Sequence, residues 1–238
     1  MFFSRKISAE KLLNSFTDCH SHILPGVDDG VQTCDEALQI LSFYEDQGVK
    51  KVIFTPHIME DIPKNSAEFL RTEFAKFQHL YNGDIELTLA AEYMLDSGFN
   101  KHLKSGELLC LFDNYLLVEM SYAVATVDYT SIIYEIMSRG YFVVLAHPER
   151  YLYFRKEEYR ELKDMGGMFQ LNFPSLFGVY GKSVQARAKW LLETSCYDFV
   201  GSDIHNFKHF SNTLNRGKLS KSHIGLIKNI NNRNWSQL

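Results

Sequence analysis

The sequence has little cysteine or proline and no strong excess of either charge. It holds four cysteines and five prolines in 238 residues, and 25 basic against 29 acidic side chains give a formal net charge of −4. This balance provides no excess of positive charge for binding nucleic acid or an anionic membrane. The cysteines lack paired short spacing, so they are predicted to be reduced and mostly buried: Cys19, Cys34, Cys110 and Cys196.

Long hydrophobic runs are also missing. The segment Met1–Lys6 lacks the charged-then-apolar order of a signal peptide. The longest apolar runs, such as Tyr141–Ala146, are far too short to span a bilayer. We therefore expect a soluble cytoplasmic protein.

The sequence does contain a regular alternation of short β-branched or aromatic runs with stretches of helical spacing. Thr33 and Glu36 form a capping box ahead of one apolar stripe, and Gly48 is placed to end that helix. Similar stripes close at Gly83, Gly140 and Gly166. The apolar runs predict seven strands, at Phe16–Cys19, Lys51–Thr55, Ile85–Ala91, Tyr115–Glu119, Phe142–Ala146, Met168–Leu171 and Tyr197–Gly201.

Short apolar strands flanked by helices are typical of a parallel sheet covered by helices. About seven strand–helix units, 45% hydrophobic residues and no composition break predict an α/β fold in a single domain over residues 1–238. A closed barrel is favoured over an open doubly wound sheet. Outside this alternation, Ser8–Phe16 predicts a short amphipathic helix packed as a plug on the barrel bottom rather than a docking helix. Residues 219–238 predict a terminal helix that frays.

Residue types that bind metals gather at the predicted strand ends, which is where barrels of this kind build their active sites. Six of the seven strands end in or just before a histidine, glutamate or aspartate, and only the sixth, near Gln170–Asn172, offers no obvious ligand. The strings at these ends are DCHSH with GVDDG, TPH, AE, VE, AHPER and SDIHN. Burying so many ionisable groups at one mouth without counter-charge would be prohibitively costly, and metal cations supply that charge.

The His20-x-His22 pair is weak by itself, but a strand directs both imidazoles to one side. Imidazoles with nearby carboxylates suit Mn²⁺, Fe²⁺ or Zn²⁺. Other mechanisms lack their residues: no glycine-rich phosphate loop is present, and no cysteine has the arginine six positions on that a thiolate phosphatase needs. The remaining histidines His79, His102 and His223 are predicted to be solvated.

These strings, in this order and spacing from about Asp18 to Asn206, resemble the PHP (polymerase and histidinol phosphatase) superfamily. Within it they are most similar to the bacterial manganese-dependent tyrosine-protein phosphatases encoded with capsular and exopolysaccharide genes. The resemblance implies a distorted (β/α)7 barrel of PHP type with three divalent metals, manganese above all, and Fe, Zn or Mg as alternatives. It also implies direct hydrolysis of a phosphoester, without a covalent phospho-enzyme.

The resemblance assigns nine ligands to three ions. The first ion would take His20, His22, Glu92 and Asp203. The second would share Glu92 and add Glu119 and His147, and the third would take Asp29, His57 and His205. Arg150, three residues past His147, matches the arginine expected to bind the substrate phosphate. The expected catalytic residues are then Arg150, His205 and Asp203.

The chain departs from the family pattern in its basic residues. Relatives often carry basic side chains just after the second-strand histidine or a few residues past the last one. Here His57 is followed by Ile58-Met59-Glu60-Asp61, so Lys208 or His209 is expected to bind substrate in place of the missing arginine, although lysine lacks the forked geometry.

Alternative functions stay open. A small-molecule phosphoesterase, acting on histidinol phosphate or a nucleotide, would keep the chemistry and change the substrate. A protein of another class would be a non-catalytic, metal-bound docking partner of a kinase. The resemblance favours the tyrosine phosphatase, and it implies a membrane-anchored bacterial tyrosine kinase as partner.

Overall fold

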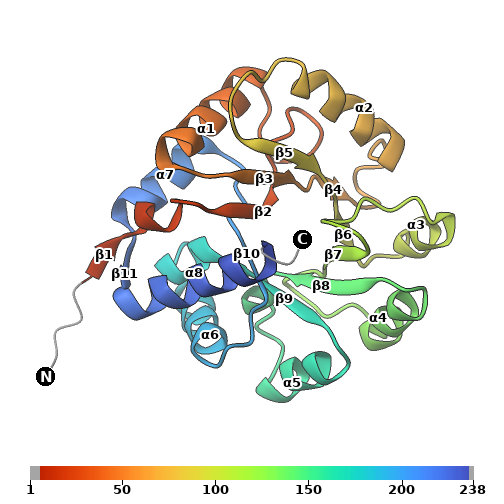
Figure 1. Ribbon diagram of the computed structural model, residues 1–238. Helices are drawn as coiled ribbons and strands as arrows, with labels where there is room; N and C mark the ends of the chain where they lie inside the picture. The colour runs from red at the N-terminus through yellow and green to blue at the C-terminus, as the bar shows by residue number, and fades with distance from the viewer. Residues whose placement is uncertain (1–5, 236–238) are drawn as a thin grey trace, which may run out of the picture.

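The computed structural model describes residues 6–235, in which parallel strands curl into a distorted barrel surrounded by helices (Figure 1). One sheet has the strand order β2-β3-β5 and the other has the order β10-β9-β8-β7-β6-β4. All pairings inside these two sheets are parallel. The strands are β2 (Thr17–Ser21), β3 (Lys51–Phe54), β4 (His57–Ile58), β5 (Glu86–Leu89), β6 (Glu92–Met94), β7 (Tyr115–Glu119), β8 (Phe142–Ala146), β9 (Met168–Asn172) and β10 (Phe199–Gly201). The predicted α/β barrel with seven strand units is confirmed.

The distortion arises just past the ends of the second and third predicted strands, where each is broken and continues as a further short strand, β4 or β6, that was not predicted. Thr55-Pro56 separates β3 from β4, and Pro56 has no N–H to continue a ladder. Because β3 pairs with β5 while β4 pairs with β6, each broken strand passes from one sheet to the other. This crossing sets His57 directly opposite Glu92 in the register.

The barrel closes between β2 and β10 without a full ladder. The N–H of Asp203 donates to the carbonyl of His20 at 2.8 Å, and the N–H of His22 donates to the carbonyl of Ile204 at 3.0 Å. Beneath them the buried carboxylate of Asp18 accepts hydrogen bonds from the backbone N–H and hydroxyl of Ser202. Residues from the two ends of the sequence therefore meet at one edge of the barrel mouth.

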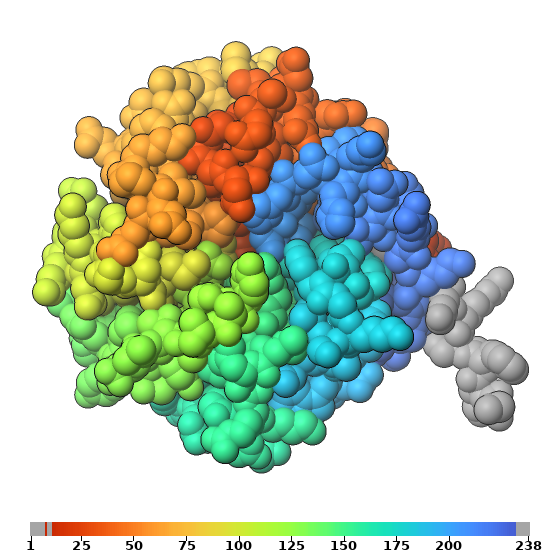
Figure 2. All heavy atoms as spheres, turned by 180° about the vertical axis from the view of Figure 1, so that it is seen from behind, coloured from red at the N-terminus to blue at the C-terminus, as the bar shows by residue number. Residues whose placement is uncertain are grey.

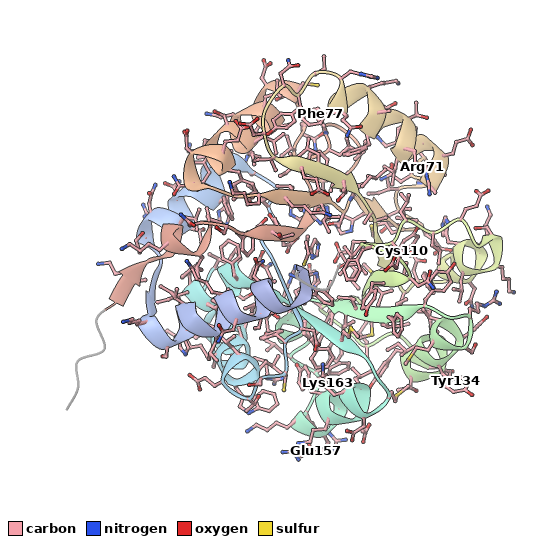
Figure 3. The ribbon with its side chains drawn as sticks, in the orientation of Figure 1. Arg71, Phe77, Cys110, Tyr134, Glu157 and Lys163 are labelled. Carbon is pink, nitrogen blue, oxygen red and sulfur yellow. The ribbon has the colours of Figure 1, made fainter. Side chains whose placement is uncertain are left out.

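Helices form the outer ring of the barrel, and their outward faces are exposed, as Tyr134 and Glu157 illustrate (Figure 3). Thr33 caps α1 through a bond from the N–H of Glu36, and Gly48 ends it in a left-handed conformation with φ of 82°. The reciprocal half of the capping box was wrongly predicted, because Glu36 instead accepts from the N–H of Phe207. The predicted end at Gly83 was also wrong, since α2 stops at Gln78. The helices of this ring are α1 (Cys34–Gln47), α2 (Ala67–Gln78), α3 (Phe99–Ser105), α4 (Tyr129–Ser138), α5 (Lys156–Asp164), α6 (Lys182–Glu193) and α7 (Phe207–Arg216).

The two ends of the described chain lie on the opposite side of the barrel from the strand carboxyl ends. Helix α8 (Lys221–Trp235) runs across that side in Figure 1, and Asn231 hydrogen-bonds both backbone groups of Thr17 at the start of β2. The segment predicted as a helix over 8–16 contains only the short 3₁₀ helix η1 (Ala9–Leu12), although its apolar residues Leu12, Leu13 and Phe16 are buried as expected. Two short strands that were not predicted pair antiparallel: β1 (Lys6–Ser8) and β11 (Lys218–Ser220). The N-terminal residues Met1–Arg5 and the fraying predicted at 236–238 lie outside the described residues.

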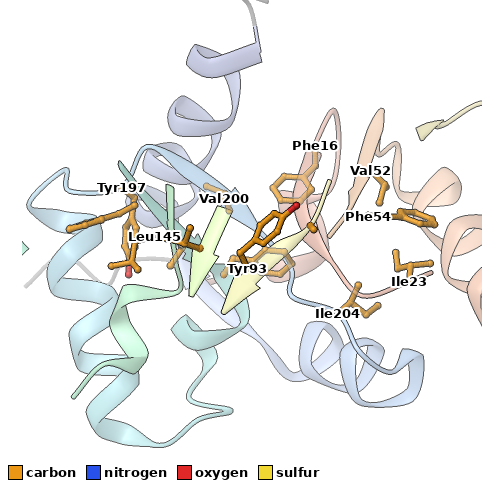
Figure 4. Close-up of a cluster of buried hydrophobic side chains, with 14 of the residues drawn as sticks. Phe16, Ile23, Val52, Phe54, Tyr93, Leu145, Tyr197, Val200 and Ile204 are labelled. Atoms are coloured by element: carbon orange, nitrogen blue, oxygen red, sulfur yellow. The ribbon is translucent and has the colours of Figure 1, made fainter. Parts of the chain in front are cut away.

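The core has an inner and an outer part, divided by the alternation of side chains along each strand. In β7, Leu117 faces the barrel interior, with Val144 and Phe199 among its neighbours, whereas Leu116 and Val118 join the larger outer cluster. Figure 4 shows part of that outer cluster around Phe16, Phe54 and Val200. Glu119 lies two residues after Leu117 on the same face of β7, so the strand delivers its carboxylate to the mouth of the barrel.

None of the helices within residues 6–235 combines the length and apolar composition that a bilayer crossing requires.

All four cysteines are free, as predicted. Only Cys19 is buried, however, and Cys34 is exposed, so the expectation of mostly buried thiols was wrong.

Candidate metal centre

The nine predicted metal ligands come from six strand ends and meet around one cleft of about 880 Å³. This face lies behind the view of Figure 1, and Figure 2 shows segments from the early, middle and late parts of the chain surrounding a central hollow. Two 3₁₀ helices, η2 (Pro148–Arg150) and η3 (Phe173–Phe177), follow β8 and β9 on this side. The convergence that the strand-end motifs predicted is therefore present.

His20 and His22 aim their Nε2 atoms at one side of Glu92. Glu92 Oε2 lies 3.1 Å from His20 Nε2 and 3.3 Å from His22 Nε2. Asp203 Oδ1 lies 3.6 Å and 3.5 Å from the same two nitrogens. Atoms bound at about 2.1 Å to one tetrahedral or octahedral ion lie about 3.0–3.4 Å apart. His20, His22 and Glu92 thus have the mutual spacing of ligands around one ion, and Asp203 lies slightly farther from both histidines.

A second group lies on the other side of Glu92. His147 Nε2 is 3.1 Å from Glu92 Oε1 and 3.6 Å from Glu119 Oε2. His57 Nδ1 is 3.0 Å from Glu119 Oε1 and 3.2 Å from Glu92 Oε2. Glu92 therefore lies between both groups, as expected of a bridging carboxylate. His57 stands close to the second group as well as to the third, which the family resemblance did not imply.

The third group lies nearest to solvent. Asp29 Oδ1 is 3.5 Å from His57 Nε2 and 3.5 Å from His205 Nε2. His22 stacks on the ring of His205 with centroids 4.0 Å apart, so it joins this group in space although the resemblance places it on the first ion. Because His22, His57 and Glu92 each lie close to two of the groups, the three groups form one continuous cluster.

The donor set fits divalent cations, because its hydrogen bonds leave lone pairs directed inward. His20 Nδ1 donates to the amide oxygen of Gln170 at 2.9 Å, and His205 Nδ1 donates to the carbonyl of Asp203 at 2.9 Å. In the neutral rings Nε2 is then unprotonated and faces carboxylates. In addition, Glu92 Oε2, His57 Nδ1 and His147 Nδ1 are buried without a hydrogen-bond partner in the described structure. A cation bound among these groups would satisfy Glu92 Oε2 and His57 Nδ1, whereas His147 would bind it through the Nε2 that faces Glu92 and Glu119.

The electrostatics of the cluster favour bound positive charge. Burial alone would lower the pKa of His20 and His57, but the carboxylates around them outweigh it and raise both pKa values to about 10. The histidines in turn hold the pKa values of Glu92 and Asp203 low in spite of their burial. The carboxylates thus remain ionised and attract either protons on the histidines or metal cations.

The backbone at two expected ligands is strained. His147 has φ of 33° and Asp203 has φ of 53°, in the left-handed region that side chains rarely adopt. Gly201, at the end of β10, leaves room for the cluster, since a Cβ there would lie 2.5 Å from the Cβ of His20. Strain of this kind persists where the surroundings impose it, often at functional sites.

Sequence reasoning missed the residues that orient the ligands. Gln170, at the strand dismissed as offering no ligand, holds His20 and also accepts from the N–H of His147 at 3.2 Å. Asp28 accepts from His22 Nδ1 at 2.9 Å and from the N–H of His57 at 3.1 Å. Asn172 donates to Asp203 Oδ2 at 2.8 Å. Only their positions in the sequence could have indicated these residues, because each of them ends or follows a strand next to a ligand.

Arg150 enters the same cleft, held between two tyrosines. Its guanidinium carbon lies 4.8 Å from the ring centre of Tyr180 and 5.4 Å from that of Tyr122. Its Nη1 is 3.5 Å from Asp203 Oδ2. Asn172 also donates to the Tyr180 hydroxyl at 3.2 Å, which connects this arrangement to the cluster. Neither tyrosine was identified from the sequence.

The other basic and histidine predictions have mixed outcomes. His209 is exposed and lines the cleft, whereas Lys208 is exposed and is not among the lining residues. His79 is exposed as predicted. His102 is half-buried, and burial lowers its pKa. His223 is also half-buried and pairs with Glu193 at 2.9 Å, so neither of these two is fully solvated.

A distorted parallel α/β barrel with histidines and carboxylates able to hold metal ions at its carboxyl-terminal mouth has the architecture of a metal-dependent hydrolase. The particular family follows from comparison: residues 16–224 match the family model described as capsular polysaccharide synthesis, CpsB/CapC. The chain belongs to this CpsB/CapC family.

Named relatives agree. The chain is 30% identical over 202 residues to the tyrosine-protein phosphatase YwqE of Bacillus subtilis, covering 80% of this chain and 78% of that protein. It is 30% identical over 205 residues to the tyrosine-protein phosphatase CpsB of Streptococcus agalactiae serotype V, covering 79% and 82%. A solved structure from a study of YwqE and of CpsB from Streptococcus pneumoniae, described as unique metal-dependent tyrosine phosphatases, matches with a TM-score of 0.76 and 25% identity. That match covers 92% of this chain and 87% of the other.

Proposed function

We propose that this chain is a metal-dependent protein-tyrosine phosphatase that uses three divalent ions, manganese first among them. The observation that carries the proposal is the convergence of imidazole nitrogens and ionised carboxylates from distant segments in one cleft. The family membership and the names of the relatives support the same reaction. Oxygen and imidazole ligands without thiolate suit Mn²⁺, although they also accept Fe²⁺, Zn²⁺ or Mg²⁺.

The proposed ligand sets are those that the family resemblance implies; in the structure His22 and His57 each also lie close to a second group. His20, His22, Glu92 and Asp203 would hold one ion. Glu92, Glu119 and His147 would hold the second, and Asp29, His57 and His205 the third. Ions held there lower the pKa of water towards neutrality and neutralise charge on phosphoryl oxygens.

Arg150 binds the substrate phosphate in this proposal. Its planar guanidinium can hold two phosphoryl oxygens at once, and stacking between Tyr122 and Tyr180 fixes its plane over the cleft. Asp203 steadies the guanidinium from the cluster side. His205, half-buried at the rim, would act through the third ion, because its Nε2 faces Asp29 and its Nδ1 donates to the carbonyl of Asp203, which leaves it no proton for the departing oxygen.

The cleft rim suits an aromatic leaving group attached to a polypeptide. Apolar and aromatic side chains line it next to Arg150, among them Met59, Met94, Met120 and Tyr122. Tyr122 is 68% exposed, so a substrate ring can stack on it without rearrangement of the core. A tyrosine-phosphorylated protein, which we propose to be a membrane-anchored bacterial tyrosine kinase met in the cytoplasm, fits this opening better than a small polar phosphoester.

The test is turnover of a phosphotyrosine peptide alongside histidinol phosphate and a nucleoside monophosphate. We expect the peptide to be hydrolysed with the highest kcat/KM, chelation to abolish hydrolysis, and added Mn²⁺ to restore it. Undiminished turnover in excess chelator, with metal analysis confirming empty protein, would refute the metal mechanism. Preference for either small phosphoester would refute the assignment of substrate. A metal-loaded protein that binds peptide without turning it over would support the non-catalytic docking role instead.

A further inference from the structure

A second depression of about 810 Å³ opens beside the cleft. It shares Val179, His209 and Thr213 with the cleft, so the two are continuous. Its floor is apolar, formed by η3, α6, the end of α7 and β11. We call it the basic groove, defined by the lining residues Leu176, Phe177, Gly178, Val179, Gln185, Lys189, His209, Asn212, Thr213, Arg216, Gly217, Lys218, Leu219, Ser220 and His223.

The charge of the basic groove is opposite to that of the chain as a whole. Lys189, Arg216 and Lys218 line it, together with His209 and His223, and no carboxylate residue does. Within the side chains that the structure describes, the three cationic groups form no ion pair with an acidic residue. Because His223 pairs with Glu193, the positive charge of the groove comes from these three groups, and in a protein of net charge −4 they mark a surface complementary to an anion.

The opposite rim of the cleft carries negative charge. Glu60, Asp61 and Asp96 line it there, following β4 and β6. A polypeptide with its phosphoryl group at Arg150 therefore meets negative charge on one side and positive charge on the other. Acidic side chains in that polypeptide are repelled by the first rim and attracted by the basic groove.

We propose that the basic groove binds an acidic segment flanking the phosphotyrosine of the protein substrate. The inference rests on the proposed function and adds a substrate preference to it. Lys189, Arg216 and Lys218 contact carboxylates of the segment, while the apolar floor around Phe177 and Leu219 accepts its aliphatic parts. This positioning gives the substrate chain one direction across the cleft.

The experiment compares three substrates on the full chain: a phosphotyrosine peptide with aspartate and glutamate within a few residues of the phosphotyrosine, the same peptide with asparagine and glutamine, and 4-nitrophenyl phosphate. The wild-type protein should favour the acidic peptide by roughly tenfold in kcat/KM at low salt. The preference should vanish near 1 M salt, where the Debye length is about 3 Å. Equal use of both peptides by the wild-type protein at low salt overturns the inference without any variant.

The variant R216E/K218E should lose the preference and keep its rate on 4-nitrophenyl phosphate, because neither residue lies in the metal cleft. The matched control is K101E/K104E, which makes the same charge change on exposed positions of α3, across the barrel from the groove (Figure 1). It should retain the preference. An unaltered preference in R216E/K218E, or an equal loss in the control, overturns the assignment of the groove.

Two further measurements show whether the proposed function or the assignment of the groove has failed. If 4-nitrophenyl phosphate and both peptides are not hydrolysed by metal-loaded protein, the proposed function fails; in that case binding of the unphosphorylated acidic peptide, measured by fluorescence anisotropy, still decides the groove. Vesicles containing an anionic phospholipid serve as the rival ligand. Capture of these vesicles through Arg216 and Lys218, with no peptide preference, overturns the peptide assignment in favour of a membrane surface.

Discussion

The metal cleft and the basic groove adjoin one another, yet they are built by opposite rules. In the cleft, Glu92 and His20 are fully buried, and the ligand atoms around them lie 3.0–3.6 Å apart in fixed pairs. In the groove, Arg216 and Lys218 are exposed, and neither forms an ion pair with an acidic side chain that the structure describes. Buried charges are costly unless they are paired, so few other residue types can replace the charged residues of the cleft. Exposed charges of the groove can be replaced by many residue types. We therefore expect substitutions in the cleft to lower kcat/KM strongly for every substrate. Substitutions in the groove should lower it weakly, and only for acidic peptides.

The largest effect should come from Glu92→Gln. This substitution keeps the shape of the side chain but removes the charge that faces His20, His22, His57 and His147. We expect kcat/KM to fall by roughly a thousandfold or more on every substrate, with loss of bound metal. Activity and metal content are measured together, and Glu86→Gln, on an exposed position of β5, is the control. Full activity of the Glu92 variant would remove the cluster from the mechanism.

Arg150→Lys should have the next largest effect. Lysine keeps the charge but loses the fork that holds two oxygens and the plane that stacks on Tyr180, so we expect a loss of about a hundredfold in kcat/KM. Metal content should be unchanged, as measured by elemental analysis. Arg139→Lys, in an exposed pair on α4, is the matched control. Simultaneous loss of metal would assign Arg150 to the cluster instead of to the substrate.

Asp28→Asn tests the residues that orient the ligands. The variant weakens the acceptor for His22 Nδ1 while leaving every proposed ligand in place. Metal affinity should drop by about 10–100-fold, and excess Mn²⁺ should restore turnover. Titration of metal into stripped protein measures the affinity, with exposed Asp46→Asn as the control. Failure of excess metal to rescue would point to a role of Asp28 other than orientation.

Arg216→Gln should have the smallest effect. Removing one exposed charge of the basic groove should lower kcat/KM for the acidic peptide by about two- to threefold, the size of a solvent-exposed ion pair. The neutral peptide and 4-nitrophenyl phosphate should be unaffected. A loss that extends to 4-nitrophenyl phosphate would mean that cleft and groove are not independent.

The same contrast explains what could be predicted from the sequence. The seven strands and the histidines and carboxylates at their ends could be predicted, because a parallel barrel brings all strand carboxyl ends to one mouth, so local motifs report a shared site. The assignment of nine ligands to three ions came from the family resemblance. The breaks at Thr55-Pro56 and before Glu92 were not accessible, because they reflect how strands exchange between sheets and not the composition of either strand. Helix α7 was missed, although it has a strong apolar face, because it follows directly on the last ligands.

Residues that act through tertiary contacts were harder still to identify. Gln170 and Asn172 carry no metal-ligand signal, and their roles depend on His20 and Asp203, which lie far away in sequence. The stacking of Tyr122 and Tyr180 on Arg150 joins three separate loops. The basic groove joins α6, α7 and β11, and β11 itself was not predicted. Contacts between distant segments leave little trace in any short window of sequence.

Anomalous diffraction at the manganese edge, from active protein crystallised with Mn²⁺, tests the central claim most directly. We expect anomalous peaks at about 2.0–2.3 Å from ligand atoms of His20, His22, Glu92 and Asp203, of Glu92, Glu119 and His147, and of Asp29, His57 and His205. Crystals of fully active protein with no anomalous peak among these side chains would contradict it.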